Sequence, residues 1–160
     1  MSALLGPAVE DAARRSVLCW LASTDAQGQP NVSPKEIFAV ADDTHMVVAN
    51  IASPATARNL CANPKVCLSF VDIFVQKGFK VRGTATEVKP ADPDFPRWVA
   101  PLRTMAGDRF PIHGVFVVKA EAVEPIVAPS YRLFPGDTTE ASQVEAALRT
   151  YGVLRPGPQA

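Results

Sequence analysis

Cysteine is scarce in this chain of 160 residues, and the few cysteines form no recognisable pattern. Cys19, Cys61 and Cys67 are odd in number and contain no Cys-x-x-Cys spacing. A disulfide framework and a structural zinc site are therefore excluded, because each needs paired or closely spaced thiols. No metal site is predicted. All three cysteines stand among apolar neighbours, so we expect them to be small buried residues.

Long apolar runs and an excess of either charge are also absent. No run approaches the roughly 20 residues of a membrane-spanning helix. Sixteen Lys and Arg balance sixteen Asp and Glu. This balance argues against binding along nucleic acid or an acidic membrane surface, although it permits a local cationic pocket for one small anion. The N-terminus lacks the basic-then-apolar layout of a signal peptide, so a cytoplasmic location is expected.

The hydrophobic pattern predicts one domain of antiparallel strands joined by tight turns. Strands are expected over residues 16–24, 31–40, 45–50, 65–74, 79–88 and 112–127, and helices over residues 7–15, 53–62, 96–106 and 142–151. Short turns between successive strands favour a closed or split β-barrel over a parallel α/β sheet. Pro34 interrupts the second strand, and proline cannot donate a ladder hydrogen bond. It therefore marks an edge, a bulge or a ligand-facing break.

The start of the helix over residues 53–62 is the first candidate for binding chemistry. Ser53 is placed as the N-cap and Pro54 at the first helical position. A helix N-terminus offers free N–H groups and a partial positive charge to a phosphate. Thr56 adds a hydroxyl and Arg58 a charged donor. The structural alternative is that Ser53 only caps the helix and Arg58 is a solvated surface residue.

Two further groups of polar residues stand at strand ends. Ser33 and Lys35 are two positions apart, so they share one face of a strand and can present a hydroxyl and an ammonium to the same anion. Lys77 and Gly78 open the fifth strand, where a glycine permits close approach of the backbone to a flat ligand. An ordinary solvent face and a plain hairpin turn are the structural alternatives.

In this order and spacing the segments resemble the pyridoxamine 5′-phosphate oxidase-like family of FMN-binding split barrels. The resemblance covers roughly residues 10–125. It is carried by Gly28-Gln29-Pro30-Asn31-Val32-Ser33-Pro34-Lys35, Ala49-Asn50, Thr56-Ala57-Arg58-Asn59-Leu60, Asn63-Pro64-Lys65-Val66 and Phe79-Lys80-Val81-Arg82-Gly83-Thr84-Ala85. It implies a mainly β fold, a six-stranded antiparallel split β-barrel with short helices. Residues 1–128 are expected to form the barrel, and residues 129–160 an irregular segment and helix packed on the same domain.

The same resemblance implies FMN as the cofactor, bound at a homodimer interface. The phosphate contacts match residues 31–35 and 56–59, and the ring contacts match the backbone of residues 33–35 and 48–50 with help from residues 77–79. The cofactor-binding residues implied in this way are Asn31, Ser33, Pro34, Lys35, Val48, Ala49, Asn50, Thr56, Arg58, Asn59, Lys77 and Gly78.

The sequence departs from the true vitamin oxidase at three places. That enzyme carries Arg-x-x-x-x-Lys on the second strand, where Ser33 stands near the place of the arginine. Its Arg-Lys pair at the phosphate helix is replaced by Ala55-Thr56. Its C-terminal segment rich in tryptophan and arginine has no counterpart in the last 35 residues. FMN binding is therefore expected, whereas oxidation of pyridoxamine phosphate is not.

The leading hypothesis is an FMN-dependent oxidoreductase that acts on an unidentified small molecule. The flavin then performs the redox chemistry, which explains why no protein acid, base or nucleophile stands out. Lys35 or Lys77 near the ring would stabilise negative charge on the reduced flavin. A flavin-binding electron carrier or sensor and a deazaflavin-dependent reductase are the alternatives. His45 and His113 are expected in surface or capping roles, and Trp20 and Trp98 in the core.

Overall fold

The computed structural model describes residues 4–155 and residue 157, and its dominant feature is one antiparallel sheet. Its strands are β1 Cys19–Thr24, β2 Pro30–Lys35, β3 Phe38–Asp42, β4 His45–Asn50, β5 Lys65–Asp72, β6 Lys77–Val88 and β7 Gly114–Val127. Its helices are α1 Pro7–Arg15, α2 Pro54–Ala62, α3 Phe95–Ala106, α4 Ser130–Leu133 and α5 Glu140–Tyr151, with a 3-10 turn at Gly107–Arg109. The predicted mainly β fold with short helices is confirmed.

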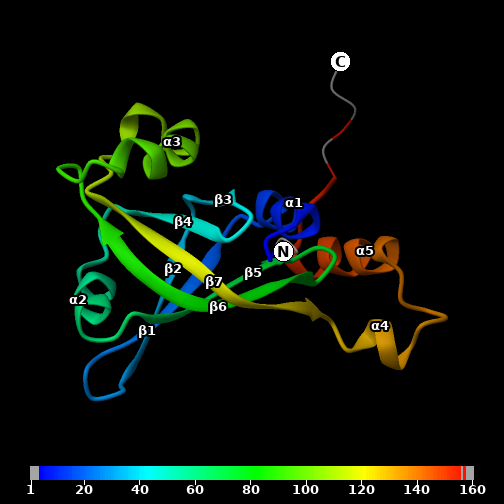
Figure 1. Cartoon of the computed structure of the whole chain (residues 1–160). Coiled ribbons are helices and arrows are strands. Elements are labelled where there is room, and N and C mark those ends of the chain that lie inside the picture. The colour runs from blue at the N-terminus through cyan, green and yellow to red at the C-terminus, as the bar shows by residue number, and fades with distance from the viewer. Residues whose placement is uncertain (1–3, 156, 158–160) are drawn as a thin grey trace.

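The order of strands across the sheet is β2-β1-β5-β6-β7-β4-β3. Strands β2 and β3 are therefore the two edges, although only Glu36 and Ile37 separate them in sequence. A flat sheet of seven strands would put its edges roughly 29 Å apart. The chain from Lys35 to Phe38 reaches at most about 11 Å. The sheet must curl until its edges approach each other, and this produces the open barrel of Figure 1.

The strand predicted over residues 31–40 is therefore two strands on opposite edges, which makes seven strands instead of six. The break falls at Glu36 and Ile37, after Pro34. Pro34 stays inside β2, where it lies opposite Trp20. It is tolerated because β2 has a neighbour on one side only, so the missing N–H costs no ladder hydrogen bond. The expectation of an edge at Pro34 is confirmed.

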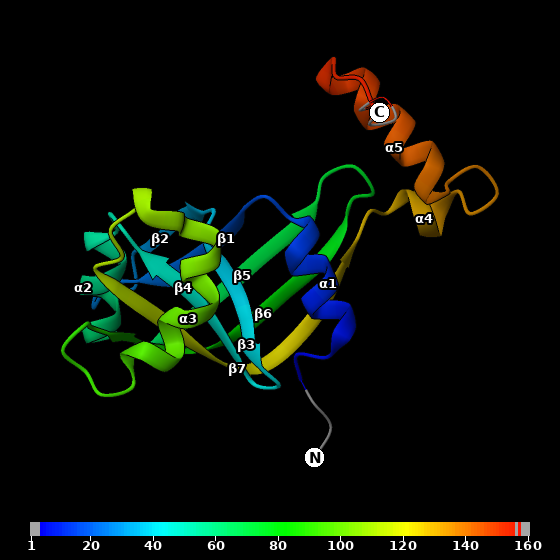
Figure 2. The same ribbon diagram turned by 90° about the horizontal axis from the view of Figure 1, so that it is seen from above.

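Two apolar clusters hold the barrel together. The inner cluster contains fully buried Leu21, Phe70 and Phe116, and the second lies beneath α3 around Val99 and Leu102. Strand β4 contributes to both, because alternate side chains point to opposite faces of a strand. Each large side chain buried in this way stabilises the fold by about 1.5–3 kcal/mol. Helix α3 thus covers one outer face of the barrel (Figure 2).

Two expectations about burial are wrong. Trp20 is 46% exposed because the alternation of β1 turns it outward, between Cys19 and Leu21, which face the core. Cys61 lies on the exposed side of α2, whereas Cys19 is buried and Cys67 partly buried. In both cases the position of the residue on its own strand or helix, and not its type, decides whether it is buried.

The segment after β7 leaves the barrel and forms α4 and α5 at the end opposite α2 (Figures 1 and 2). Helix α5 begins with a capping box between Thr139 and Ser142, and its C-cap is Gly152 in the left-handed conformation. The loose tail predicted over residues 155–160 lies almost wholly outside the described residues. No helix in the described part of the chain is long and apolar enough to cross a membrane.

Candidate functional site

Helix α2 presents an N-terminus that its own chain leaves open. Ser53 occupies the N-cap position and Pro54 opens the helix, as the sequence predicts. The Ser53 side chain, however, makes no capping hydrogen bond, and the first turn contains no acidic residue. The N–H groups of Ala55 and Thr56 therefore retain the donor capacity and partial positive charge that bind anions at helix N-termini.

Lys35 reaches this N-terminus from the last position of β2. Its ammonium donates a hydrogen bond to the Ser53 hydroxyl, the side-chain group at the N-cap position of α2. Burial lowers the pKa of Lys35. The Cys19 thiol stays protonated, because burial raises its pKa to about 12. Within the described residues no carboxylate lies within ion-pair distance of Lys35. A half-buried cation without a counter-charge is suited to binding an anion.

Thr56 is fully buried one turn into α2, and its hydroxyl oxygen has no hydrogen-bond partner. Among the described residues it is the one buried side-chain nitrogen or oxygen in that condition. A buried hydroxyl left unpaired costs about 1–3 kcal/mol. Arg58 is exposed and lies about 200° from Thr56 around the helix. Thr56 and Arg58 therefore face different sides of α2 and do not converge on one phosphate.

Asn50 fixes the turn that delivers α2. Its side-chain amide donates to Glu87 at 2.6 Å, and its side-chain oxygen accepts from the Ser53 N–H at 3.1 Å. Its backbone oxygen accepts from His113 N at 2.9 Å. With only 8% of its surface exposed, Asn50 supports the candidate site from behind. Glu87 was not singled out from sequence, because its partner is 37 positions away and no local pattern marks the pair.

Asn31 and Asn59 meet at the far end of β2. The Asn59 amide donates to the Ser23 hydroxyl at 3.0 Å, and the Asn31 amide lies 3.5 Å from the same oxygen. These contacts fasten α2 to β1 and β2. Both asparagines therefore hold the walls of the site together.

A hollow of about 210 Å³ lies between the end of β2 with its connection to β3, the end of β4 and the start of α2. Its lining includes three of the predicted residues, Pro34, Lys35 and Ala49, with exposed Glu36 as its acidic member. The remaining lining comes from Ile37, Ile51, Ala52, Ser53 and Phe110. Sequence reasoning missed Ile37, Ile51 and Phe110 as site residues, because ordinary apolar residues carry no mark of a ligand. Val48 lies outside the hollow, in the inner core, with its strand paired on both sides.

The β5–β6 hairpin lies at the end of the barrel opposite α2, beside α4 and α5 (Figures 1 and 2). Lys77 and Gly78 are the first two residues of β6 at this hairpin and are not among the residues that line the hollow. Lys77 Nζ is 2.8 Å from the Glu140 carboxylate. Gly78 packs so closely on β5 that a Cβ would lie 2.0 Å from the backbone oxygen of Phe70. The glycine is therefore required by the barrel itself. One chain does not bring the three predicted groups of polar residues together.

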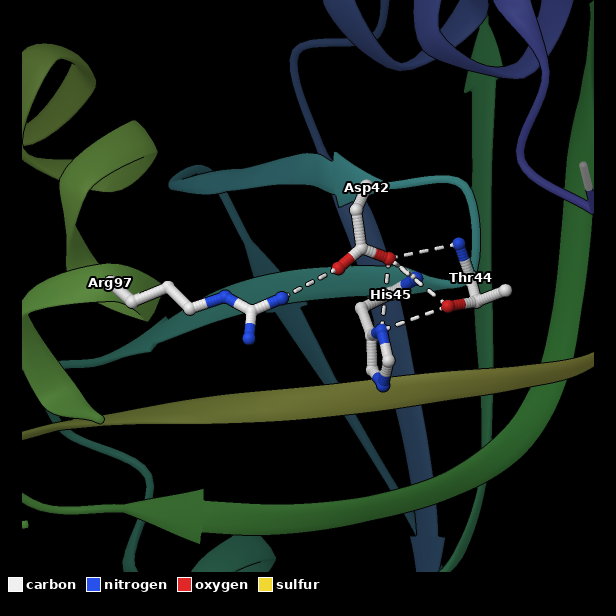
Figure 3. Close-up of polar contacts among 4 residues, drawn as sticks. All are labelled: Asp42, Thr44, His45 and Arg97. Atoms are coloured by element: carbon white, nitrogen blue, oxygen red, sulfur yellow. Dashed lines mark hydrogen bonds and ion pairs between the residues drawn. The ribbon is translucent and has the colours of Figure 1, made fainter. Parts of the chain in front are cut away.

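A separate polar cluster closes the β3–β4 turn (Figure 3). Asp42 accepts hydrogen bonds from the Thr44 N–H and the His45 N–H, each at 2.9 Å, and pairs with Arg97 at 3.2 Å. Burial alone would raise the pKa of Asp42, but hydrogen bonds from Thr44 and His45 outweigh it and hold the pKa at about 2. The ring of His45 uses Nδ1 toward Asp42 and packs on Trp98. His45 thus has the capping role expected from sequence.

The family model described as Pyridoxamine 5'-phosphate oxidase matches residues 5–143. No curated protein matches the sequence.

Several solved structures share the fold. HupZ of Group A Streptococcus is 22% identical, with a TM-score of 0.65, 77% of this chain covered and 94% of that one. An FMN-binding protein of Syntrophomonas wolfei is 16% identical, with a TM-score of 0.62 and coverages of 73% and 82%. The heme storage protein HutZ of Vibrio cholerae is 23% identical, with a TM-score of 0.60 and coverages of 77% and 94%.

Proposed function

The chain belongs to the pyridoxamine 5′-phosphate oxidase family, and from that premise we propose that it binds FMN and acts as an FMN-dependent oxidoreductase on a small molecule. The observation that carries the proposal is Lys35, a half-buried cation without a carboxylate partner beside the uncapped start of α2. A phosphate placed there would supply the missing counter-charge. It would also accept hydrogen bonds from the first N–H groups of the helix.

The residues around the hollow fit the phosphate and one edge of a flavin. Lys35, the Ser53 hydroxyl and the N–H groups of α2 would hold the phosphate, and the orphaned Thr56 hydroxyl lies in the same turn of helix. Ala49 and Ile51 offer an apolar wall to the ring. When bound, FMN supplies the hydride and electron transfer. The protein residues bind it, orient it and limit access of water.

The hollow of one chain is too small for the whole cofactor, which supports a homodimer. Its volume of 210 Å³ is smaller than the roughly 300 Å³ of the smallest typical pockets for small-molecule ligands. The uncovered face of β1 and β2 exposes Trp20 and Val32. A second apolar hollow of about 430 Å³ lies nearby, and its lining includes Val17, Trp20 and Ile73. We infer that a second copy covers this face and brings its own Lys77 and Gly78 to the cofactor.

The first experiment is an absorbance spectrum and mass spectrum of the purified protein, followed by titration with FMN. A flavin spectrum, or a rise in Tm on adding FMN, supports the proposal. A colourless protein that FMN does not stabilise overturns it. A haem spectrum, or stabilisation by a deazaflavin alone, would replace FMN with that cofactor. Light scattering tests the dimer, and a monomer at micromolar concentration contradicts it.

The variant Lys35→Met tests the observation that carries the proposal. Losing one charge-assisted hydrogen bond costs about 1.5–3 kcal/mol, so FMN should bind roughly ten- to a hundredfold more weakly. Lys65→Met is the matched control, because Lys65 is an exposed lysine at the start of β5. Equal FMN affinity in the two variants would remove Lys35 from the site.

Turnover separates the enzyme from the electron carrier. Reduction of the bound flavin by a nicotinamide donor, with reoxidation by a small organic acceptor over many cycles, supports the oxidoreductase. The carrier or sensor is supported if chemical reductants reduce the bound flavin but no pair of donor and acceptor gives repeated turnover.

A further inference from the structure

Glu87, near the end of β6, is connected to the start of α2 through two hydrogen bonds. Its Oε1 accepts from the Asn50 side-chain amide at 2.6 Å, and the side-chain oxygen of Asn50 accepts from the Ser53 N–H at 3.1 Å. Ser53 lines the hollow, and its hydroxyl accepts from the Lys35 ammonium. A continuous chain of contacts therefore runs from Glu87 to the anion site, defined here as Lys35, the Ser53 hydroxyl and the first N–H groups of α2.

The carboxylate of Glu87 is largely withdrawn from solvent. Its side chain is 15% exposed, and its second oxygen lies 4.0 Å from Lys89 Nζ, at the limit of an ion pair. The Lys89 side chain is itself well exposed, so solvent screens that contact. Taking a carboxylate out of water is costly, and an apolar residue of similar size often serves stability equally well. Packing alone therefore does not explain why an acid stands here.

The first residue of β7 leaves room for this carboxylate. A Cβ on Gly114 would lie 2.8 Å from Glu87 Oε1 and 3.3 Å from Glu87 Cγ. Gly114 is also the residue opposite Asn50 in the pairing of β4 with β7. Strands β4, β6 and β7 therefore meet at the contact between Glu87 and Asn50, and the glycine allows the carboxylate to reach the amide.

An acid at this position determines which way the Asn50 amide faces. A side-chain amide has a donor end and an acceptor end, whereas an ionised carboxylate only accepts hydrogen bonds. Glu87 therefore requires the amide nitrogen of Asn50 to face it, which leaves the amide oxygen toward the Ser53 N–H. The bond is charge-assisted, and such bonds are stronger than those between neutral groups. Glu87 in this way fixes the turn from which α2 begins.

We propose that Glu87 is a positioning residue for the anion site and acts on it through the Asn50 amide. This inference rests on the proposed function, because the anion is taken to be the phosphate of FMN. Glu87 itself touches no ligand. It orients Asn50, Asn50 holds the Ser53 N–H, and Ser53 is thereby kept beside Lys35 at the start of α2.

Positioning and simple charge repulsion predict opposite results when Glu87 is changed. The carboxylate and a phosphate are both negative, so if only its charge mattered, removing it would strengthen FMN binding. If Glu87 acts through Asn50, removing its oxygens frees the amide to turn, and FMN binding should weaken. The sign of the change in affinity therefore distinguishes the two roles.

The test is the affinity for FMN of the full chain and of the variants Glu87→Met and Glu87→Gln. Both variants remove the charge, but only glutamine keeps an acceptor for the Asn50 amide. Glu87→Met should bind FMN roughly three- to tenfold more weakly, and Glu87→Gln should stay within about twofold of the natural chain. Gly114→Ala keeps the charge but displaces the carboxylate, so it should weaken binding as Glu87→Met does.

Glu121→Met is the matched control, because Glu121 is an exposed glutamate of β7, and it should bind FMN like the natural chain. The titrations are made where urea unfolding shows every variant to be folded, so that a loss of stability does not appear as a loss of affinity. If Glu87→Met does not fold, the contrast between Gly114→Ala and Glu87→Gln decides.

Unchanged or tighter binding by Glu87→Met, equal losses in Glu87→Met and Glu87→Gln, or natural affinity in Gly114→Ala would overturn the inference. FMN binding by the natural chain would still leave the proposed function standing in those cases. If the natural chain fails to bind FMN, both fall.

Discussion

Lys35 and Lys77 stand at opposite ends of the same barrel, and the two ends treat their charges differently. At the α2 end, Lys35 is half-buried, donates to a neutral hydroxyl and has its pKa lowered by burial. At the hairpin end, Lys77 is paired with Glu140, and that hydrogen bond raises its pKa. The ammonium of Lys35 therefore has no carboxylate partner, whereas the ammonium of Lys77 is paired with a carboxylate of the same chain.

This difference shows how a ligand site can be recognised without its ligand. An unmatched cation beside an uncapped helix is a cost that the fold alone does not explain. A matched cation needs no ligand and costs the fold little. For this reason the proposed phosphate site is at the Lys35 end and not at the Lys77 end.

The largest expected effect is at the hairpin end, with Gly78→Ala. The new Cβ would lie 2.0 Å from the Phe70 backbone oxygen, so β5 and β6 must separate. We expect a loss of about 3 kcal/mol in the free energy of unfolding. Gly136→Ala is the control, since a Cβ there meets nothing within 4 Å, and it should change stability by less than about 0.5 kcal/mol. Urea unfolding measures both, and equal stability would contradict the close packing of the hairpin.

The next effect is at the α2 end, with Thr56→Val. Valine has nearly the same shape but no hydroxyl to leave unpaired, so the ligand-free protein should become more stable by about 1 kcal/mol. If the Thr56 hydroxyl donates to the phosphate of bound FMN, the variant should also bind FMN roughly fivefold more weakly. Thr86→Val, on the exposed face of β6, should change neither quantity. Destabilisation by Thr56→Val would mean that its hydroxyl already has a partner.

The smallest effect compares the two lysines by pH. The pKa of Lys35 is lowered in the folded protein, so its contribution favours folding more as pH rises toward the ordinary value of 10.5. The pKa of Lys77 is raised, so its contribution is present below 10.5 and is lost as pH rises through the folded pKa. In the natural chain, Lys35 makes the free energy of unfolding rise with pH in alkali, and Lys77 makes it fall. The variant Lys35→Met should lack that rise, and the variant Lys77→Met should lack that fall.

Urea unfolding at several values between about pH 8 and pH 11 measures both slopes. Cys19 and Tyr131 also titrate in alkali, and they are common to all three proteins, so differences between variants cancel most of their contribution. For each variant, the difference in unfolding free energy from the natural chain is plotted against pH. Slopes of the same sign for Lys35→Met and Lys77→Met would contradict the described difference between the two lysines.

The sequence predicted two local features next to the candidate site. Serine followed by proline at Ser53 marks a helix start, and spacing by two places Ser33 and Lys35 on one face of a strand. Both features depend only on residues a few positions apart, so the rest of the fold does not change them. Asn50 and Asn59 were predicted as cofactor contacts, yet their amides are used by Glu87 and Ser23. These partners are 37 and 36 positions distant, beyond the reach of any local pattern.

The sequence by itself determined five of the seven strands, four of the five α-helices and the family, because turn residues, alternation and capping act over a few neighbouring positions. Tertiary structure decided where those pieces meet. It split one predicted strand into the two edges of a barrel, since two residues cannot cross an open sheet of seven strands. It turned Trp20 outward and moved Lys77 to the end opposite Lys35. Which lysine keeps an unmatched charge was settled by burial and by a carboxylate 63 positions away, and neither is visible in a linear chain.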